Sequence, residues 1–376
     1  MISAAIGEQR ALGKHINALT GVRAVAVLLV FLGHLQQRFF PYAGLDGSIL
    51  SAAPYYGMTT FFVLSGFVIH WNYSELFAKE RPAAAWWKFF VARFARLWPL
   101  HFAVSVLAIM QSRDFGRFAQ HVFMVQTWVY EGSFNISYYN TWSISTEWFF
   151  YFGYAVSFPL IARWLRSGSI WLLPAIVTPA FAAYWFAGPV TGAPDLWLRY
   201  IAPYLRLFEF STGVVAAQIV MTRRVHGKND LSDVTLALVI ALTVMFYHTA
   251  LCQRTNVNYL VAPIVAVALM VSSDRRSLLS SALSATSLLW IGDRSYSIYL
   301  LEAVYLVALG YDFETHRTFT WSDFVVGMTC ASFGFALVLI LSHFCWRYFE
   351  MPARMVVKQA LSGRLNSLRP SRTTLS

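Results

Sequence analysis

Long apolar runs separated by short polar stretches fill most of this 376-residue chain. Ten of the runs have about 17 to 25 residues, the length that a helix needs to cross roughly 30 Å of hydrocarbon. The pattern therefore predicts an all-α, polytopic membrane protein with about ten transmembrane helices. The predicted spans are residues 24–40, 54–71, 86–110, 142–161, 169–188, 199–221, 231–251, 257–273, 287–309 and 323–346.

One further apolar run, AQHVFMVQTWVY at 119–130, is too short to cross a bilayer and is expected to be re-entrant or interfacial. Long polar stretches occur only at the two ends of the chain, and no internal repeat is visible. We therefore expect one transmembrane domain at 24–346, an N-terminal cytoplasmic segment at 1–23 and a basic cytoplasmic tail at 347–376. The lack of a repeat also weakens the case for an inverted-repeat transporter.

The composition supports a membrane protein, because 57% of the residues are hydrophobic and only 12% are charged. The formal net charge of +11 would by itself suit a nucleic-acid-binding protein. With both termini in the cytoplasm, however, 22 of the 29 Lys and Arg residues lie on the cytoplasmic side and six on the opposite side. This positive-inside distribution predicts cytoplasmic termini and no nucleic-acid partner. The three cysteines lack metal-ligand spacing, so no metal is expected.

Ionisable residues inside the predicted spans are few, and each costs about 2.5–3.5 kcal/mol at the centre of a membrane helix. His34, Glu147 and Glu302 are expected in the outer part of the membrane, judged from their distances to the span ends. A histidine with a carboxylate partner forms a general base, so His34 and Glu147 are predicted to be a catalytic pair. A structural hydrogen bond between helices is the alternative. Arg206 and Glu209, three residues apart, are expected to pair with each other or to form a substrate site.

Three arginines are expected at the cytoplasmic mouth of the helices. Arg23 precedes His34 by eleven residues on the same helix face, about 16 Å along the axis. Arg93 and Arg96 share a face one turn apart in WWKFFVARFARLWPL. Such a group would suit a phosphate-bearing ligand, although basic residues at span ends also follow from membrane topology. Ser65 is not expected to be a nucleophile, because no base is near it in the sequence.

Six short motifs occur in order over nearly the whole chain. They are the Arg-x10-His opening (Arg23, His34), FFVLSGF (61–67), RFARLWPL (93–100), TWSISTEWFFYF (141–152), GDRSYSIYLLE (292–302) and FEMPAR (349–354). Together they resemble the acyltransferase-3 family of integral membrane acyltransferases. Members of this family move acyl groups, commonly acetyl, from cytoplasmic acyl-CoA to acceptors such as cell-envelope sugars.

The resemblance implies that His34 is the essential histidine and Glu147 its acidic partner. It also implies that Arg23, Arg93 and Arg96 bind the phosphates of the acyl-CoA donor. The expected location is the bacterial cytoplasmic (inner) membrane.

Two departures from the family pattern stand out. Glu302 occupies a position where many relatives have His, which leaves the role of that position open. Some relatives carry a fused extracytoplasmic esterase-like domain, whereas this chain ends in a basic tail, so a stand-alone form is expected.

The expected activity is O-acyl transfer from acyl-CoA, with acetyl-CoA as the simplest donor, to a hydroxyl of a cell-envelope carbohydrate or lipid-linked sugar. His34 would act as the general base, oriented by Glu147, and a transient acyl-histidine is an alternative route. The competing class is a proton-coupled transporter, in which His34 and Glu147 would relay protons. A third class is a structural membrane scaffold whose polar pairs are satisfied.

Overall fold

The computed structural model describes residues 16–40, 49–113, 115–130, 141–165, 192–225, 258–274, 276–308 and 321–367, with isolated positions between 172 and 182. Every regular element in this part of the chain is helical, so the all-α prediction is confirmed there. Five described helices are long and apolar enough to cross a membrane, and the chain is a multi-pass membrane protein. They are Asn17–Phe39, Ala52–Lys79, Pro82–Met110, Pro194–Arg223 and Trp321–Ser362.

Eight of the ten predicted spans coincide with helices of the structure. The span predicted at 231–251 lies outside the described residues, and the one at 169–188 contains only isolated described positions. The total of ten spans therefore stays a prediction, as does the side of the membrane on which the termini lie. The main helices are α2 (Asn17–Phe39), α3 (Ile49–Lys79), α4 (Pro82–Ser112), α6 (Trp142–Leu165), α9 (Pro203–Val225), α11 (Asn258–Ser272), α13 (Thr286–Asp293), α14 (Ser295–Ala308), α15 (Trp321–Cys345) and α16 (Met351–Ser367).

The span predicted at 287–309 is not one helix but two, because α13 ends at Asp293 and α14 begins at Ser295. The break falls at Arg294, whose guanidinium lies over the rings of Trp290 and Trp346 at 4.2 Å and 4.4 Å. The prediction from long apolar runs missed this break, because a few polar residues barely lower the average hydropathy of a long apolar segment.

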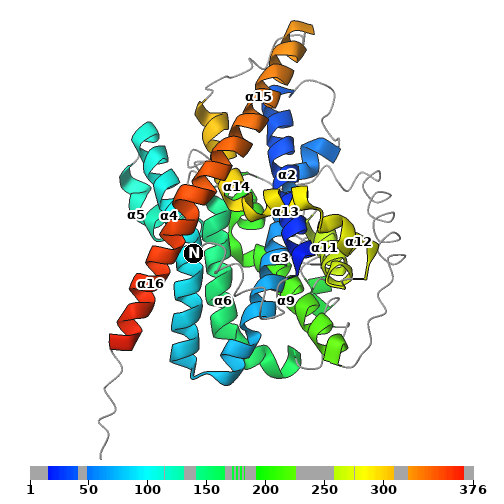
Figure 1. The fold of residues 1–376 in the computed structure, drawn as a ribbon, viewed down its shortest axis with the longest axis vertical. Helices are drawn as coiled ribbons and strands as arrows, with labels where there is room; N and C mark the ends of the chain where they lie inside the picture. The colour runs from blue at the N-terminus through cyan, green and yellow to red at the C-terminus, as the bar shows by residue number, and fades with distance from the viewer. Residues whose placement is uncertain are drawn as a thin grey trace, which may run out of the picture.

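Helix α3 lies at the centre of the bundle and packs most extensively against α9 and α2 (Figure 1). Two glycines allow the backbones of α3 and α9 to touch. A Cβ atom at Gly66 would overlap the carbonyl oxygen of Phe210, and one at Gly213 would overlap that of Val63. Small residues permit such close approach between membrane helices, where van der Waals packing drives association.

The short apolar run at 119–130 folds back against α6 and does not form a long helix. It contains part of the five-residue helix α5 (Phe118–Val122), followed by turns. Thr127 donates through its backbone N–H and its hydroxyl to Ser145 Oγ, at 3.2 Å and 2.8 Å. Trp128 Nε1 donates to the Ser145 carbonyl at 3.2 Å. These bonds satisfy polar groups that an irregular segment would otherwise leave without partners.

The C-terminal helices form one tilted rod along a side of the bundle (Figure 1). Helix α15 continues through the π-helical turn η4 (Trp346–Glu350) into α16, which packs against α4. The predicted start of the tail at 347 falls inside this rod. Glu350 is buried and accepts a 2.5 Å hydrogen bond from Ser297 on α14, so the first residues of the predicted tail belong to the packed body.

Candidate functional site

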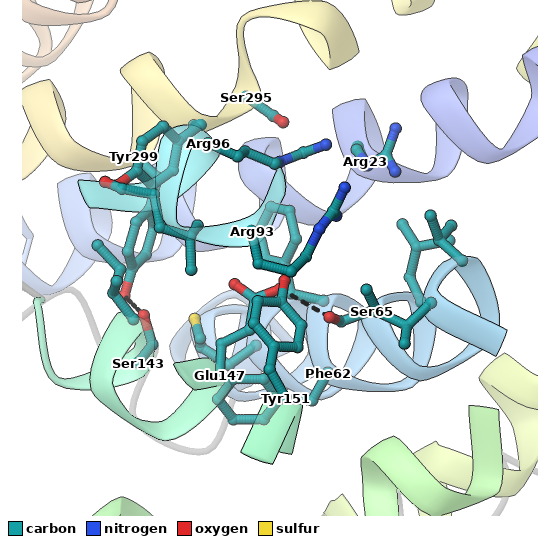
Figure 2. Close-up of a pocket in the computed structure, with 18 residues that line it drawn as sticks. Arg23, Phe62, Ser65, Arg93, Arg96, Ser143, Glu147, Tyr151, Ser295 and Tyr299 are labelled. Atoms are coloured by element: carbon teal, nitrogen blue, oxygen red, sulfur yellow. Dashed lines mark hydrogen bonds between the residues drawn. The ribbon is translucent and has the colours of Figure 1, made fainter. Parts of the chain in front are cut away.

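A pocket between α2, α3, α4, α6 and α14 contains most of the candidate residues (Figure 2). It encloses about 760 Å³ of empty space, counted together with its open mouth. The polar side chains on its wall include Arg23, Arg93, Arg96, Ser65 and Glu147.

The structure brings Arg23, Arg93 and Arg96 to this one pocket, as the sequence predicted. Arg93 is buried, donates a 2.7 Å hydrogen bond to the Tyr73 hydroxyl and lies 4.9 Å from the centre of that ring. Its Nε has no hydrogen-bond partner within the described residues. In the same part of the chain, Arg23 and Arg96 make neither a hydrogen bond nor a direct ion pair. Three guanidinium groups therefore face one space with donors to spare.

A fourth arginine near this group was missed by the sequence analysis. Arg354 of α16 lies close enough to Arg93 and Arg96 for their charges to repel one another. It stands one turn after Glu350, at the end of the FEMPAR motif. The motif was visible in the sequence, but it was counted as part of a tail, and only the packing of α16 on α4 brings it near the pocket.

Glu147 lies at the level of the arginines and not beside His34. Its Oε1 accepts hydrogen bonds from the Ser65 hydroxyl at 2.6 Å and from the Tyr151 hydroxyl at 2.5 Å. Figure 2 shows this group beneath Arg93. No described arginine forms a direct ion pair with Glu147.

The carboxylate that contacts His34 is Glu302, which corrects the predicted pairing of His34 with Glu147. His34 Nδ1 lies 2.9 Å from Glu302 Oε1, and the side chains are 23% and 0% exposed. The prediction placed Glu147 at the depth of His34, whereas the structure places it at the level of Arg23 and Arg93. The position of a residue within a predicted span did not give its depth, and α14 rather than α6 packs against α2.

The pocket runs from the arginines along α14, and neither His34 nor Glu302 lines it. Its far end is marked by the hydroxyls of Ser143 and Tyr299, which are hydrogen-bonded at 2.8 Å. Figure 2 shows these two residues on one side of the pocket and Arg23 on the other. Glu302 follows Tyr299 by three residues on α14, so it lies about one helical turn beyond the pocket wall.

Arg206 and Glu209 form the predicted pair, and the pair is saturated. Both side chains are fully buried, with Nε–Oε2 and Nη2–Oε1 distances of 2.7 Å and 3.1 Å. The remaining nitrogen of Arg206 donates to the Tyr200 carbonyl at 2.9 Å, and Thr59 donates to Glu209 at 2.9 Å. Neither charged residue lines the pocket, so the pair is structural.

Comparison with known proteins decides the family. The family model described as an acyltransferase domain, acyltransferase-3, matches residues 16–341. The chain belongs to the acyltransferase-3 family. This acyltransferase-3 protein is 25% identical over 319 residues to the acyltransferase MdmB of Streptomyces mycarofaciens. The alignment covers 76% of this chain and 78% of MdmB. It is 24% identical over 369 residues to the peptidoglycan O-acetyltransferase OatA of Listeria monocytogenes.

The Listeria alignment covers 91% of this chain but only 56% of OatA, so the chain spans little more than half of that relative. No solved structure matches the chain. The family identifies the protein as a membrane acyltransferase and favours this class over a proton-coupled transporter or a scaffold.

Within the described residues no group of three or more His, Cys, Asp or Glu side chains is arranged to hold a metal ion.

Proposed function

We propose that this protein transfers an acyl group, in the simplest case acetyl, from a cytoplasmic acyl-CoA to a hydroxyl of a cell-envelope carbohydrate or lipid-linked sugar. The observation that carries the proposal is the pocket with three arginines that have no direct ion pair among the described residues. The printed name of OatA, a peptidoglycan O-acetyltransferase, supports an acceptor in the cell envelope. The bacterial source of both relatives supports a bacterial cytoplasmic membrane.

The arginines are suited to the phosphates of the donor. Coenzyme A carries a diphosphate and a separate phosphate, and guanidinium groups bind phosphate through paired N–H donors. Arg23, Arg93 and Arg96 face one space from two helices, so they can hold several phosphate oxygens at once. The pantetheine arm would then extend along the pocket toward Ser143 and Tyr299 and bring the thioester toward His34.

In the proposed reaction His34 takes the proton of the acceptor hydroxyl as its oxygen attacks the thioester carbonyl. Glu302 accepts from Nδ1–H, which leaves the lone pair of Nε2 for the hydroxyl proton. A carbon–oxygen bond forms, the carbon–sulfur bond breaks, and the imidazolium returns its proton to the departing thiolate. The carboxylate of Glu302 stabilises the imidazolium while it exists.

The proposal is tested with detergent-purified, monodisperse protein, acetyl-CoA labelled in the acetyl group, and a fraction of cell-envelope glycans. We expect free coenzyme A and label in the glycan, located by mass spectrometry. Protein that neither binds coenzyme A nor releases it from acetyl-CoA would overturn the proposal. Proton flux in proteoliposomes without release of coenzyme A would instead support a transporter.

Replacement of His34 tests the base. We expect His34→Ala to lower the transfer rate by about 10²- to 10⁴-fold, the usual contribution of a positioned acid–base group. Coenzyme A binding should survive, because the arginines lie elsewhere in the bundle. Glu302→Gln should lower the rate more than Glu147→Gln does at saturating donor. The reverse order would return the orienting role to Glu147.

A further inference from the structure

Glu147 poses a problem for any anion site in the pocket. A carboxylate beside three guanidinium groups is the natural partner for them, because opposite charges in a partly buried site attract strongly. An ion pair between Glu147 and one of these arginines would occupy the donors that a phosphate needs. The pocket would then be neutralised from within, and each ligand phosphate would have to displace a carboxylate.

In the structure Glu147 is hydrogen-bonded to hydroxyl groups and forms no direct ion pair with a described arginine. Two hydroxyls from different helices, Ser65 of α3 and Tyr151 of α6, both donate to the same oxygen of Glu147 at 2.6 Å and 2.5 Å. Hydrogen bonds to a carboxylate are shorter and stronger than those between neutral groups. Tyr151 is 2% exposed and cannot reorient without repacking its neighbours, which include the ring of Phe89 at 5.8 Å.

Arg93 is held on its other side. Tyr73 accepts a hydrogen bond from its Nη2 at 2.7 Å and places its ring 4.9 Å from the guanidinium carbon. The carboxylate and the guanidinium are thus each fixed by hydroxyl groups, and the two stay unpaired within the described residues. The negative charge of Glu147 still reduces the repulsion among the arginines, but it takes up none of their N–H donors.

We infer that Ser65 and Tyr151 are positioning residues that hold Glu147 away from Arg23, Arg93 and Arg96, so that the arginines stay open to a polyanionic donor. The inference rests on the proposed function, because it concerns how the same pocket binds the phosphates of an acyl-CoA. It gives Glu147 an electrostatic role at the donor end of the pocket and gives Ser65 a role other than nucleophile.

The inference is tested by binding of coenzyme A to detergent-purified protein, measured by calorimetry. In the double variant Ser65→Ala/Tyr151→Phe, Glu147 is released and pairs with the arginines. The affinity for coenzyme A should then fall by about tenfold, as expected when a charge-assisted contact must be displaced. Adding Glu147→Gln to this double variant removes the competing charge and should bring the affinity back to within about threefold of the wild type.

Glu147→Gln alone should bind coenzyme A at least as tightly as the wild type does. Tyr154→Phe serves as a matched control, because Tyr154 is buried one turn from Tyr151 on α6, bonds to His70 and does not line the pocket. Its affinity for coenzyme A should equal that of the wild type.

Restoration by Glu147→Gln separates positioning from a merely structural role, since a distorted pocket would not be repaired by a third substitution. The inference is wrong if the double variant binds normally, or if its weak binding persists in the triple variant. Wild-type protein that does not bind coenzyme A would overturn the proposed function, and the inference with it. A wild type that binds while the triple variant is not restored would overturn the inference alone.

Discussion

The molecule contains arginines in two contrasting environments. Arg206 is fully buried, and all three of its nitrogens donate, two to Glu209 and one to the Tyr200 carbonyl. Arg23 and Arg96, in the pocket, have neither a hydrogen bond nor a direct ion pair in the described part of the chain. Both environments lie within the helical bundle, but they differ in resident partners and in access to solvent.

The difference separates a structural charge from a receptor for a ligand. A buried arginine that contributes only to the fold is expected to be saturated, because an uncompensated charge costs several kcal/mol. Arginines that remain without partners, grouped around one space, keep their donors for something that arrives from outside. Arg206, whose N–H donors all have partners, and the pocket arginines, whose donors are open, should therefore respond in opposite ways to mutation, to added ligand and to salt.

The largest effect is expected from Arg206→Met. This change leaves Glu209 buried without its counter-charge and should lower the stability by about 3–5 kcal/mol. Thermal unfolding in detergent measures it, and loss of expression would be an equivalent result. Arg206→Met/Glu209→Leu should recover part of the loss, because it removes both charges. An unchanged melting temperature in the single variant would contradict the assignment of a structural pair.

Arg96→Gln should act on the ligand and not on the fold. Loss of hydrogen bonds between a charged group and phosphate should weaken coenzyme A binding by about 1.5–3 kcal/mol, which is roughly 10- to 150-fold. The melting temperature should stay the same or rise, since repulsion with Arg93 is relieved. Arg93→Gln/Arg96→Gln should raise the KM for acyl-CoA far more than the KM for the acceptor. Normal binding of acyl-CoA by a folded double variant would mean that both arginines serve only the orientation of the protein in the membrane.

Coenzyme A itself should stabilise the wild type. At ten times Kd a ligand that binds only the folded state contributes about 1.4 kcal/mol, which thermal unfolding in detergent can detect. The variant Arg93→Gln/Arg96→Gln should show no such gain at the same concentration. Equal stabilisation of both proteins would mean that the ligand binds elsewhere.

The smallest expected difference is in the response to salt. The pocket is open to solvent, so raising the salt from about 0.1 M to about 1 M should weaken coenzyme A binding several-fold. The stability lost in Arg206→Met should change little over the same range, because buried pairs are screened much less. Titrations at several salt concentrations measure the affinity for coenzyme A, and melting curves at the same concentrations measure the stability lost in Arg206→Met.

The sequence predicted those features that depend on position along a single helix. Arg93 and Arg96 share a face because they are three residues apart, and Arg206 pairs with Glu209 for the same reason. The turn of a helix is sufficient for such predictions.

Features that depend on which helices pack together could not be predicted in this way. His34 contacts Glu302 across 268 residues, and Glu147 contacts Ser65 across 82. Ser65 was set aside as a nucleophile because no base is near it in the sequence, although the fold places the carboxylate of Glu147 beside it. Arg354 was counted as part of a tail because the packing of its helix on α4 is not visible in the sequence.

The glycine contacts between α3 and α9 have a mechanical consequence. Because the backbones touch at Gly66 and Gly213, no layer of side chains lies between these helices at those positions, and we expect the two to move as one body. We therefore expect the wall that carries Ser65 to keep its distance from α9, and any movement that admits a ligand to involve other helices. A covalent cross-link between α3 and α9, placed away from the pocket, should leave the turnover rate unchanged.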